Sequence, residues 1–522
     1  MQTLILAALL ASLCPAYSQA KEPDWNTPSA NPYQWDEQTL PLKIQAGQKH
    51  ALEWPVTVTG MLLPKRQILK TLELKPGDPL FGIMKSILSL SPDFQDFNGF
   101  WDWLGLNNYP ESDPHPYPMG VSIIHRNGTD GFTLSCAACH SSNLFGTSII
   151  GMTNRFPRSN LFFIHGQRNL ERMPPGLFAA LFGADDAEKA MYAEARERIR
   201  SIGLQKPQAL GLDASPAQVA LSLAKRAKTP DAERTAYDAS HPSVTILDHT
   251  VMDSKPAVWW NVKYKTHWLS DGSVMGGNPV FTNFLWNELG RGVDIPDLAK
   301  WMDETPDKIE ELTTAVFASE APKWRDFFGE NSIQIERAKR GEKVYIASCR
   351  KCHGEYVKDW AKSTDTVQVN YDETVRDVGT DPKRYQGMQA LADALNPLAF
   401  SKKFNIVIEP HSGYVPPPLV GIWARYPYLH NNSIPNLCAF MLPPDQRPKT
   451  YYSRKALDRN QDYDQECMGY PIQASHSREK PDPEHLFDTG KEGLSNAGHY
   501  DRIFSRLDAA QKRDLIEFLK TL

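Results

Sequence analysis

The stretch Cys136-Ala137-Ala138-Cys139-His140 determines how this 522-residue chain is interpreted, and Cys349-Arg350-Lys351-Cys352-His353 repeats its pattern. Each is a C-x-x-C-H run, the attachment signal for a c-type haem. The two cysteines span one helical turn, so both thiols can add to the vinyl groups of one porphyrin, and the histidine becomes the proximal iron ligand. A zinc site would need four ligands closing on one ion, and no second C-x-x-C flanks either run. The sequence therefore predicts two covalently bound haem c groups, with His140 and His353 on the irons.

The composition is that of an ordinary soluble globular protein, with 41% hydrophobic and 23% charged residues. A formal charge of -5 argues against a nucleic acid or an anionic membrane as partner. Forty prolines, more than the 32 glycines, indicate long ordered loops. The length allows two or three domains.

The N-terminus is typical of an export signal. Leu4 to Leu13 is an apolar run that is too short to span a bilayer, and Ser18-Gln19-Ala20 offers small residues for cleavage. Cys14 as a lipid-anchor cysteine is the alternative. No later segment reaches 18 consecutive apolar residues, so no membrane span is expected. We predict a signal peptide over residues 1–20 and a periplasmic or secreted mature protein.

Two cysteines remain outside the haem motifs and the N-terminal segment. They are Cys438 and Cys467, an even pair in what would be an oxidising compartment. A disulfide between them is favoured, and two unpaired buried thiols are the alternative.

The pattern along the chain predicts a mainly α fold with two cytochrome c-like haem domains, long loops and an N-terminal extension. Apolar residues from Ile335 to Tyr345 recur at helical spacing and lead straight into Cys349. A last amphipathic helix, with Asp508 as its N-cap, is expected to pack across this opening helix. The predicted boundaries are 21–105 for the extension, 106–330 for the first haem domain and 331–522 for the second.

Several short runs carry a resemblance to a known family. The loop from Pro427 to Ser433 is similar to a loop of the bacterial di-haem cytochrome c peroxidase superfamily, Pro-Tyr-(aromatic or Leu)-His-(Asn or Asp)-Gly-Ser, with Asn432 where glycine is usual. The chain looks closer still to the rubber-oxygenase-like branch of that superfamily. The runs that suggest this branch are Met119-Gly120, Gly379-Thr380-Asp381-Pro382, Leu442-Pro443-Pro444 with Arg447-Pro448, and Asn496-Ala497-Gly498-His499. The resemblance covers roughly residues 100 to 522.

The resemblance implies a division of labour between the two haems. The first, on His140, would react with an oxygen species, and the second, on His353, would store an electron. It also implies His499 as the sixth ligand of the second iron, with Met441 as the rival. Calcium between the domains and a small periplasmic electron donor, a cytochrome c or a cupredoxin, are further expectations from the family.

Residues near the first iron are harder to assign from sequence. Trp259 and Trp260 precede a basic cluster that includes His267, and they either pack in the core or form an aromatic wall beside the first haem. The loop histidine His430 is placed by the resemblance near the interhaem region, as ligand, hydrogen-bond partner or loop anchor. Peroxide cleavage needs a nearby acid-base group, and the candidates for it are His165, Glu171 and His267. A pocket lined by Trp259, Trp260 and Phe281 would instead suit dioxygen and an apolar substrate.

The sequence thus predicts an exported di-haem oxidoreductase that reduces hydrogen peroxide with electrons from a small donor. An oxygenase acting on an apolar substrate is the first alternative, and a non-catalytic electron carrier is the second.

Overall fold

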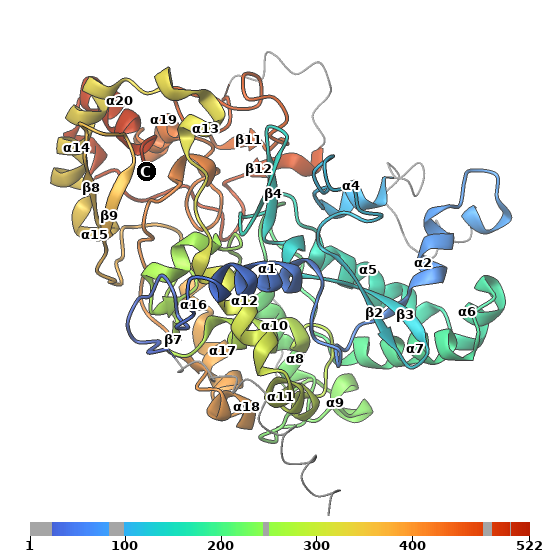
Figure 1. The fold of residues 1–522 in the computed structure, drawn as a ribbon. Coiled ribbons are helices and arrows are strands. Elements are labelled where there is room, and N and C mark those ends of the chain that lie inside the picture. Colours follow the sequence, from blue (N-terminus) through green and yellow to red (C-terminus); the bar gives the residue numbers. More distant parts are fainter. Residues whose placement is uncertain (1–22, 83–98, 244–249, 473–482, 502) are drawn as a thin grey trace, which may run out of the picture.

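The computed structural model describes residues 23–82, 99–243, 250–472, 483–501 and 503–522. The predicted signal peptide and Cys14 lie outside these residues. Helices predominate and the strands are short, which agrees with the expected mainly α class (Figure 1). In the described part of the chain, no helix is both long enough and apolar enough to span a membrane.

The helices before the second motif are short and joined by long loops. They are α1 (Thr39–Leu52), α2 (Lys65–Leu72), α4 (Phe100–Leu104), α5 (Ser159–Arg172), α6 (Pro175–Phe182), α7 (Asp186–Arg198), α8 (Ser215–Ala224), α9 (Ala236–Ser240), α10 (Pro279–Leu289), α11 (Ile295–Glu304), α12 (Pro306–Ala318) and α13 (Trp324–Phe328). The later helices are α14 (Ile335–Ser348), α15 (Arg350–His353), α16 (Lys383–Gln386), α17 (Met388–Leu395), α18 (Ala399–Lys403), α19 (Leu437–Phe440) and α20 (Ala509–Leu519). Single 3-10 turns are η1 (Cys136–Ala138), η2 (Ile199–Ser201), η4 (Trp259–Tyr264), η5 (Glu330–Ser332), η6 (Ile422–Ala424), η7 (Pro444–Gln446), η8 (Pro483–His485) and η9 (Phe504–Arg506).

The strands form small antiparallel sheets. One sheet has the order β1-β3-β2, from β1 (Leu63–Pro64), β2 (Val121–Arg126) and β3 (Thr129–Leu134), and another has the order β10-β7-β6, from β6 (His267–Trp268), β7 (Val274–Met275) and β10 (Val407–Ile408). The two-stranded sheets pair β4 (Ser141–Leu144) with β5 (Thr147–Ile150), β8 (Glu355–Lys358) with β9 (Thr366–Asn370), and β11 (Thr450–Tyr452) with β12 (Leu486–Asp488). The β2–β3 hairpin ends at Leu134, directly before the first motif.

Two helix pairs cross at a glycine in the same way. Helix α1 packs on α12, and α14 packs on α20 (Figure 1). A Cβ added at Gly47 would lie 1.9 Å from the carbonyl oxygen of Glu311, and one at Gly341 would lie 1.9 Å from that of Asp514. At each crossing the two backbones therefore touch, which only glycine permits. The structure thus repeats one device, a glycine-mediated helix crossing, in its two halves.

The predicted second-half helices are confirmed. Helix α14 spans Ile335–Ser348 and runs into Cys349. The Asp508 side chain caps α20 by accepting hydrogen bonds from the backbone amides of Ala510 and Gln511. Cys438 and Cys467 form the expected disulfide.

The hydrophobic cores do not follow the predicted boundary at residue 330. The first core combines residues of α10, α11 and α12 with α17, α18 and β10, and α17 packs against α8. The second core joins α14 and α20 to Leu144, Met152 and Trp260. Side chains from both sides of residue 330 thus share each core, and the division into two haem domains remains a prediction.

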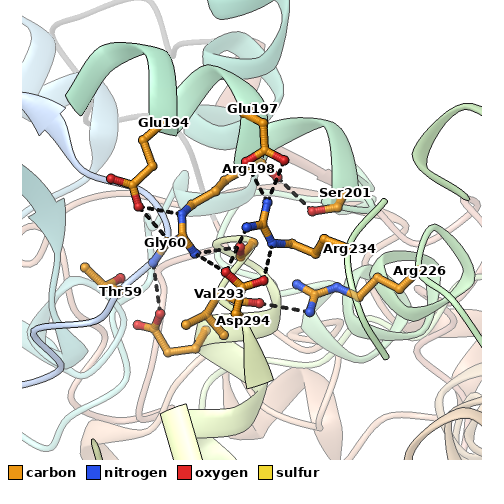
Figure 2. A network of polar contacts seen from close by, with 12 residues as sticks. Thr59, Gly60, Glu194, Glu197, Arg198, Ser201, Arg226, Arg234, Val293 and Asp294 are labelled. Atoms are coloured by element: carbon orange, nitrogen blue, oxygen red, sulfur yellow. Dashed lines mark hydrogen bonds and ion pairs between the residues drawn. The ribbon is translucent and has the colours of Figure 1, made fainter. Parts of the chain in front are cut away.

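A polar network that is partly open to solvent ties α7 to the connection between α10 and α11 (Figure 2). Arg234 forms a forked ion pair with Asp294, at 2.8 and 2.9 Å, and also pairs with Glu197 at 2.8 Å. The buried Arg226 donates to the carbonyl oxygen of Val293 at 2.9 Å. Such charge-assisted bonds hold α11 in place behind the first core.

Candidate functional site

The first C-x-x-C-H run lies in the turn that follows the β2–β3 hairpin. Ala137 and Ala138 are buried, and Gly120, with φ of 101°, packs so closely that a Cβ there would lie 2.6 Å from the Cα of Ala138. The guanidinium of Arg291 donates to the carbonyl oxygen of Leu134 at 2.8 Å. Contacts within the protein, from Gly120 and from Arg291, therefore fix this turn.

Both motif histidines are oriented by the same kind of contact. His140 Nδ1 lies 3.0 Å from the carbonyl oxygen of Ala257, and His353 Nδ1 lies 2.8 Å from that of Pro417. A carbonyl only accepts, so Nδ1 carries the proton in each ring and Nε2 keeps its lone pair free for a metal. Burial lowers the pKa of His140 to about 4 and also lowers that of His353, so both rings are neutral.

The four motif cysteines are unpaired thiols. Burial raises the pKa of Cys136, Cys139 and Cys349 to about 12, so these sulfurs are protonated at neutral pH. In covalent haem attachment such thiols add to the porphyrin vinyl groups, and the neighbouring histidine ligates the iron.

One continuous cavity of about 490 Å³ reaches both motifs. Cys136, Cys139 and His140 of the first motif line it, and so do Cys349 and His353 of the second. The helix crossings contribute to its wall at matching positions, with Leu312 and Val316 from α12 and Leu515 and Leu519 from α20.

The charges on this wall suit a ligand with carboxylates. Five cationic side chains line the cavity, whereas Asp213 is its one carboxylate among the described residues; the cations are Lys255, Lys265, Arg376, Arg384 and Arg425. Haem carries propionates, so the apolar wall, the thiols, the histidines and these cations together fit haem c. The described residues contain no group of three or more His, Cys, Asp or Glu side chains arranged for a metal ion. The calcium expected from the family therefore stays a prediction.

The structure places His499 and Met441 on the same wall as His353. Neither ring nitrogen of His499 makes a hydrogen bond to a described residue, and its Nδ1 is buried. Burial, with His353 and Arg447 nearby, lowers the pKa of His499 to about 3. Met441 is buried at 3% exposure.

The loop before His499 is held by Arg447. This guanidinium donates to the carbonyl oxygens of Phe440 and Gly498, each at 2.9 Å, and to that of Asn496. Gly498 packs against the 378–380 segment, since a Cβ there would lie 2.8 Å from the Thr380 nitrogen. The 379–382 and 496–499 runs, distant in sequence, thus form one wall.

His430 also reaches the cavity, but its Nε2 is engaged. The Tyr414 hydroxyl donates to the carbonyl oxygen of Asp381 and so accepts from His430 Nε2 at 2.9 Å. The two rings stack at 4.2 Å between centroids. His430 therefore serves at least as a hydrogen-bond partner in this loop.

The other predicted residues separate into two groups. Trp259 lines the cavity with its ring 5.9 Å from that of His140, whereas Trp260 is buried in the second core and donates to the carbonyl oxygen of Val420 at 3.0 Å. The remaining candidates do not line the cavity. His267 pairs with Glu373 at 2.8 Å, Phe281 packs on Phe404, His165 packs on Trp103, and Glu171 lies exposed near the end of α5.

The sequence did not predict that side chains of α10 line the cavity. Helix α10 covers Pro279–Leu289. Its cavity-lining side chains are Val280, Thr282, Asn283, Phe284, Trp286 and Asn287. The missed signal is the Asn-x-x-x-Asn spacing, which puts two amides on one face of this helix.

Two C-x-x-C-H turns, with both histidines oriented onto one charged cavity, are features of a c-type cytochrome. Residues 413–452, which include the Pro427–Ser433 loop, match the family model described as RoxA-like, cytochrome c-like. This match supports the rubber-oxygenase-like cytochrome branch, covalently bound haem c and a haem oxidoreductase.

Two uncharacterized proteins of Sinorhizobium fredii are similar to this chain. The protein y4iJ is 28% identical over 257 residues, which cover 38% of this chain and 41% of y4iJ. The protein y4iM is 27% identical over 331 residues, which cover 55% of this chain and 68% of y4iM. The chain thus spans less than half of y4iJ and about two thirds of y4iM.

Proposed function

We propose that this chain is an exported di-haem c-type oxidoreductase that activates dioxygen at the first motif and stores electrons at the second. The observation that carries this proposal is the shared cavity, onto which both motif histidines present a free Nε2. When bound, the first iron would supply redox chemistry with an oxygen species, and the second would hold an electron. The residues of the chain itself would bind the haems, orient the motif histidines and shield the irons.

His499 supports the role of the second site as an electron store. Its half-buried imidazole lies on the cavity wall near His353, its Nδ1 is buried, and it makes no hydrogen bond to a described residue. An unsatisfied buried polar group is costly, so a partner is expected. We assign His499 as the sixth ligand of the second iron, which would leave this iron closed to small ligands.

The two motifs also differ in their access to the surface. Arg350 and Lys351, inside the second motif, are exposed, whereas Ala137 and Ala138 of the first are buried. A small electron donor, a cytochrome c or a cupredoxin, would approach the second motif more closely than the first. This difference supports electron entry at the second site and chemistry at the first.

The part of the cavity wall that α10 forms near the first motif favours dioxygen over peroxide. Helix α10 shares the first core with Cys136 and Trp259, and its cavity-lining residues are all neutral. None of the three acid-base candidates, His165, Glu171 and His267, lines the cavity. Peroxide cleavage depends on a group that moves a proton between two oxygens, and α10 offers only amides, a hydroxyl and an indole. The resemblance to the rubber-oxygenase-like branch points in the same direction.

Peroxide reduction is the second candidate function, and it rests on Asp213. This buried carboxyl lines the cavity, and burial raises its pKa, so it could hold a proton. It accepts hydrogen bonds from the backbone amide and hydroxyl of Ser215, at 3.0 and 2.6 Å.

One set of measurements tests these roles. Purified protein is assayed for oxygen uptake with a polyene and for peroxide turnover with a reduced small cytochrome. Oxygen uptake without peroxide turnover supports the proposal, and the reverse result supports the second candidate. Replacing His140 should abolish turnover and leave a low-spin spectrum from the second haem, whereas retained activity would reverse the assignment of the two sites. If both irons are low-spin and fail to bind azide, the chain is a non-catalytic electron carrier.

The ligand assignment has its own test. His499 has φ of 65°, a conformation that glycine adopts without strain, so His499→Gly removes the imidazole with little backbone cost. The variant should turn the second haem high-spin, and added imidazole should restore the low-spin spectrum. Met441→Leu is the matched control and should leave the spectrum unchanged. A high-spin second haem in the Met441 variant alone would transfer the ligand role to Met441.

A further inference from the structure

Two cationic side chains from the first half of the chain donate hydrogen bonds to one loop of the second half. The Lys255 ammonium donates to the carbonyl oxygens of Arg425 and Pro427, at 3.0 and 2.6 Å. The Arg155 guanidinium donates to those of Ala424 and Tyr426, at 3.3 and 3.0 Å. Four successive carbonyls are thus bound alternately by two cations, which secures the loop that leads to His430.

The two cations differ in what else they face. Lys255 and Arg425 line the cavity, whereas Arg155 does not line it and lies over the ring of Tyr426, 4.1 Å from its centroid. The ammonium of Lys255 has three N–H donors, of which the two carbonyls use two. Arg425 uses one donor on the carbonyl oxygen of Pro418, at 2.7 Å. Both side chains therefore keep donors available to a ligand in the cavity.

No carboxylate in the described part of the chain pairs with either of these two cations. Within the described residues, neither Lys255 nor Arg425 forms an ion pair. Burial, together with the nearby cations Arg425 and Arg155, lowers the pKa of Lys255 well below its usual range, so an anion beside it would favour its charged form. Two of the other cavity cations have a carboxylate nearby, since Arg384 pairs with Asp271 at 3.2 Å and Glu373 acts on Lys265, whereas Arg376 is exposed. Buried charges without a counter-charge are strongly unfavourable, so the cavity is expected to take up a carboxylate here.

We propose that Lys255 and Arg425 form a carboxylate clamp between the two motifs, which binds haem propionates. This inference rests on the proposed function, because the haems would supply the carboxylates. Two further contacts place the clamp between the sites. Ala257, two residues after Lys255, accepts from His140, and the Pro418 carbonyl that Arg425 binds follows Pro417, which accepts from His353.

The alternative is that Lys255 only ties the loop, and Arg155 supplies the matched control. Lys255→Gln and Arg155→Gln each remove one cation and keep an amide that can donate to the same loop. Both variants should lose similar stability, but only the first removes charge from the cavity. Lys255→Arg keeps the charge and should retain the wild-type behaviour.

The measured quantity is the midpoint potential of each haem in the full-length holoprotein, by spectroelectrochemistry at pH 7 and fixed salt. An uncompensated carboxylate favours the ferric state, so Lys255→Gln should lower at least one midpoint. We expect a change of about tenfold in the ferric–ferrous equilibrium, which is about 59 mV for one electron. Arg155→Gln should leave both midpoints within about a quarter of that shift.

Equal shifts in the two variants, or no shift in Lys255→Gln, would overturn the clamp. If Lys255→Gln does not accumulate, Arg425→Gln decides by the same criterion. Failure of the proposed function looks different, because the wild-type protein would then show no haem spectrum or only one haem.

Discussion

Alanine at either crossing glycine gives a direct test of the two-fold arrangement. The added Cβ of Gly341→Ala would lie 1.9 Å from the carbonyl oxygen of Asp514, and that of Gly47→Ala would lie 1.9 Å from the carbonyl oxygen of Glu311. Ordinary contact begins at 3.4 Å, so each helix pair must separate by about 1.5 Å. The obstacle is backbone, which cannot rotate away as a side chain could.

The size of the effect follows from two opposing terms. Overpacking in a close-packed core costs about 1–3 kcal/mol, whereas alanine stabilises a helix interior by about 1 kcal/mol relative to glycine. Because a rigid carbonyl blocks the methyl group, we expect a net loss of about 2 kcal/mol in the free energy of unfolding for each variant. Gly166→Ala in α5 is the control, because no atom lies within 4 Å of its added Cβ. It should stabilise the protein by about 0.5–1 kcal/mol.

The location of the damage is as informative as its size. Leu312 and Val316 of α12 line the cavity, as do Leu515 and Leu519 of α20. Gly47→Ala should therefore perturb the spectrum of the first haem, and Gly341→Ala that of the second. Urea unfolding followed by circular dichroism and by the Soret band measures both effects in the full-length holoprotein. Unchanged stability, or equal perturbation of both haems by either variant, would refute the reasoning.

Three further outcomes are expected. Replacing Cys438 and Cys467 by serine should lower the free energy of unfolding by about 3 kcal/mol on the chain-entropy model, measured by urea titration, and an unchanged midpoint would contradict it. Glu288→Ala leaves the buried Arg291 without its carboxylate, 3.1 Å away, and should cost about 3–5 kcal/mol in the same titration, whereas Glu288→Gln should cost less. Burial lowers the pKa of His430 to about 3 in the folded chain. Below the ordinary histidine pKa near 6.5, the unfolded chain therefore binds one proton that the folded chain does not bind, and the free energy of unfolding falls as pH falls. Between pH 6.5 and 5 this loss is about 2 kcal/mol, and His430→Asn should show a correspondingly flatter pH profile of unfolding.

Local signals were enough to predict several features of the fold. The C-x-x-C-H runs, the helix that leads into Cys349, the Asp508 cap and the disulfide all depend on short-range patterns or on a residue count. The crossing of α1 with α12 has no such signal. Helix α1 lies far from Cys136 in sequence, within the segment predicted to be an extension, yet it contacts both α12 and the turn η1 of the first motif.

The site residues were harder to predict because they depend on tertiary direction. Trp259 and Trp260 are adjacent, yet only Trp259 faces the cavity, since the turn η4 points Trp260 into the second core. His267 follows closely in sequence, but strand β6 turns it towards Glu373. Helix α10 is buried on most sides, so no polar face marked which of its residues would line the cavity.

The loop from Ala424 to His430 makes the two motif sites mutually dependent. Its carbonyl oxygens accept hydrogen bonds from the side chains of Lys255 and Arg155 in the first half. The backbone amide of Lys255 also donates to the carbonyl oxygen of His430 at 2.7 Å. Arg425 of the same loop donates to the carbonyl oxygen of Pro418, and the neighbouring Pro417 carbonyl accepts from His353. A shift of this loop would therefore move the carbonyl partners of both motif histidines together. Because sites that act at fixed geometry need rigid support, this shared loop, which lies within the family match over residues 413–452, would hold the two sites in one arrangement.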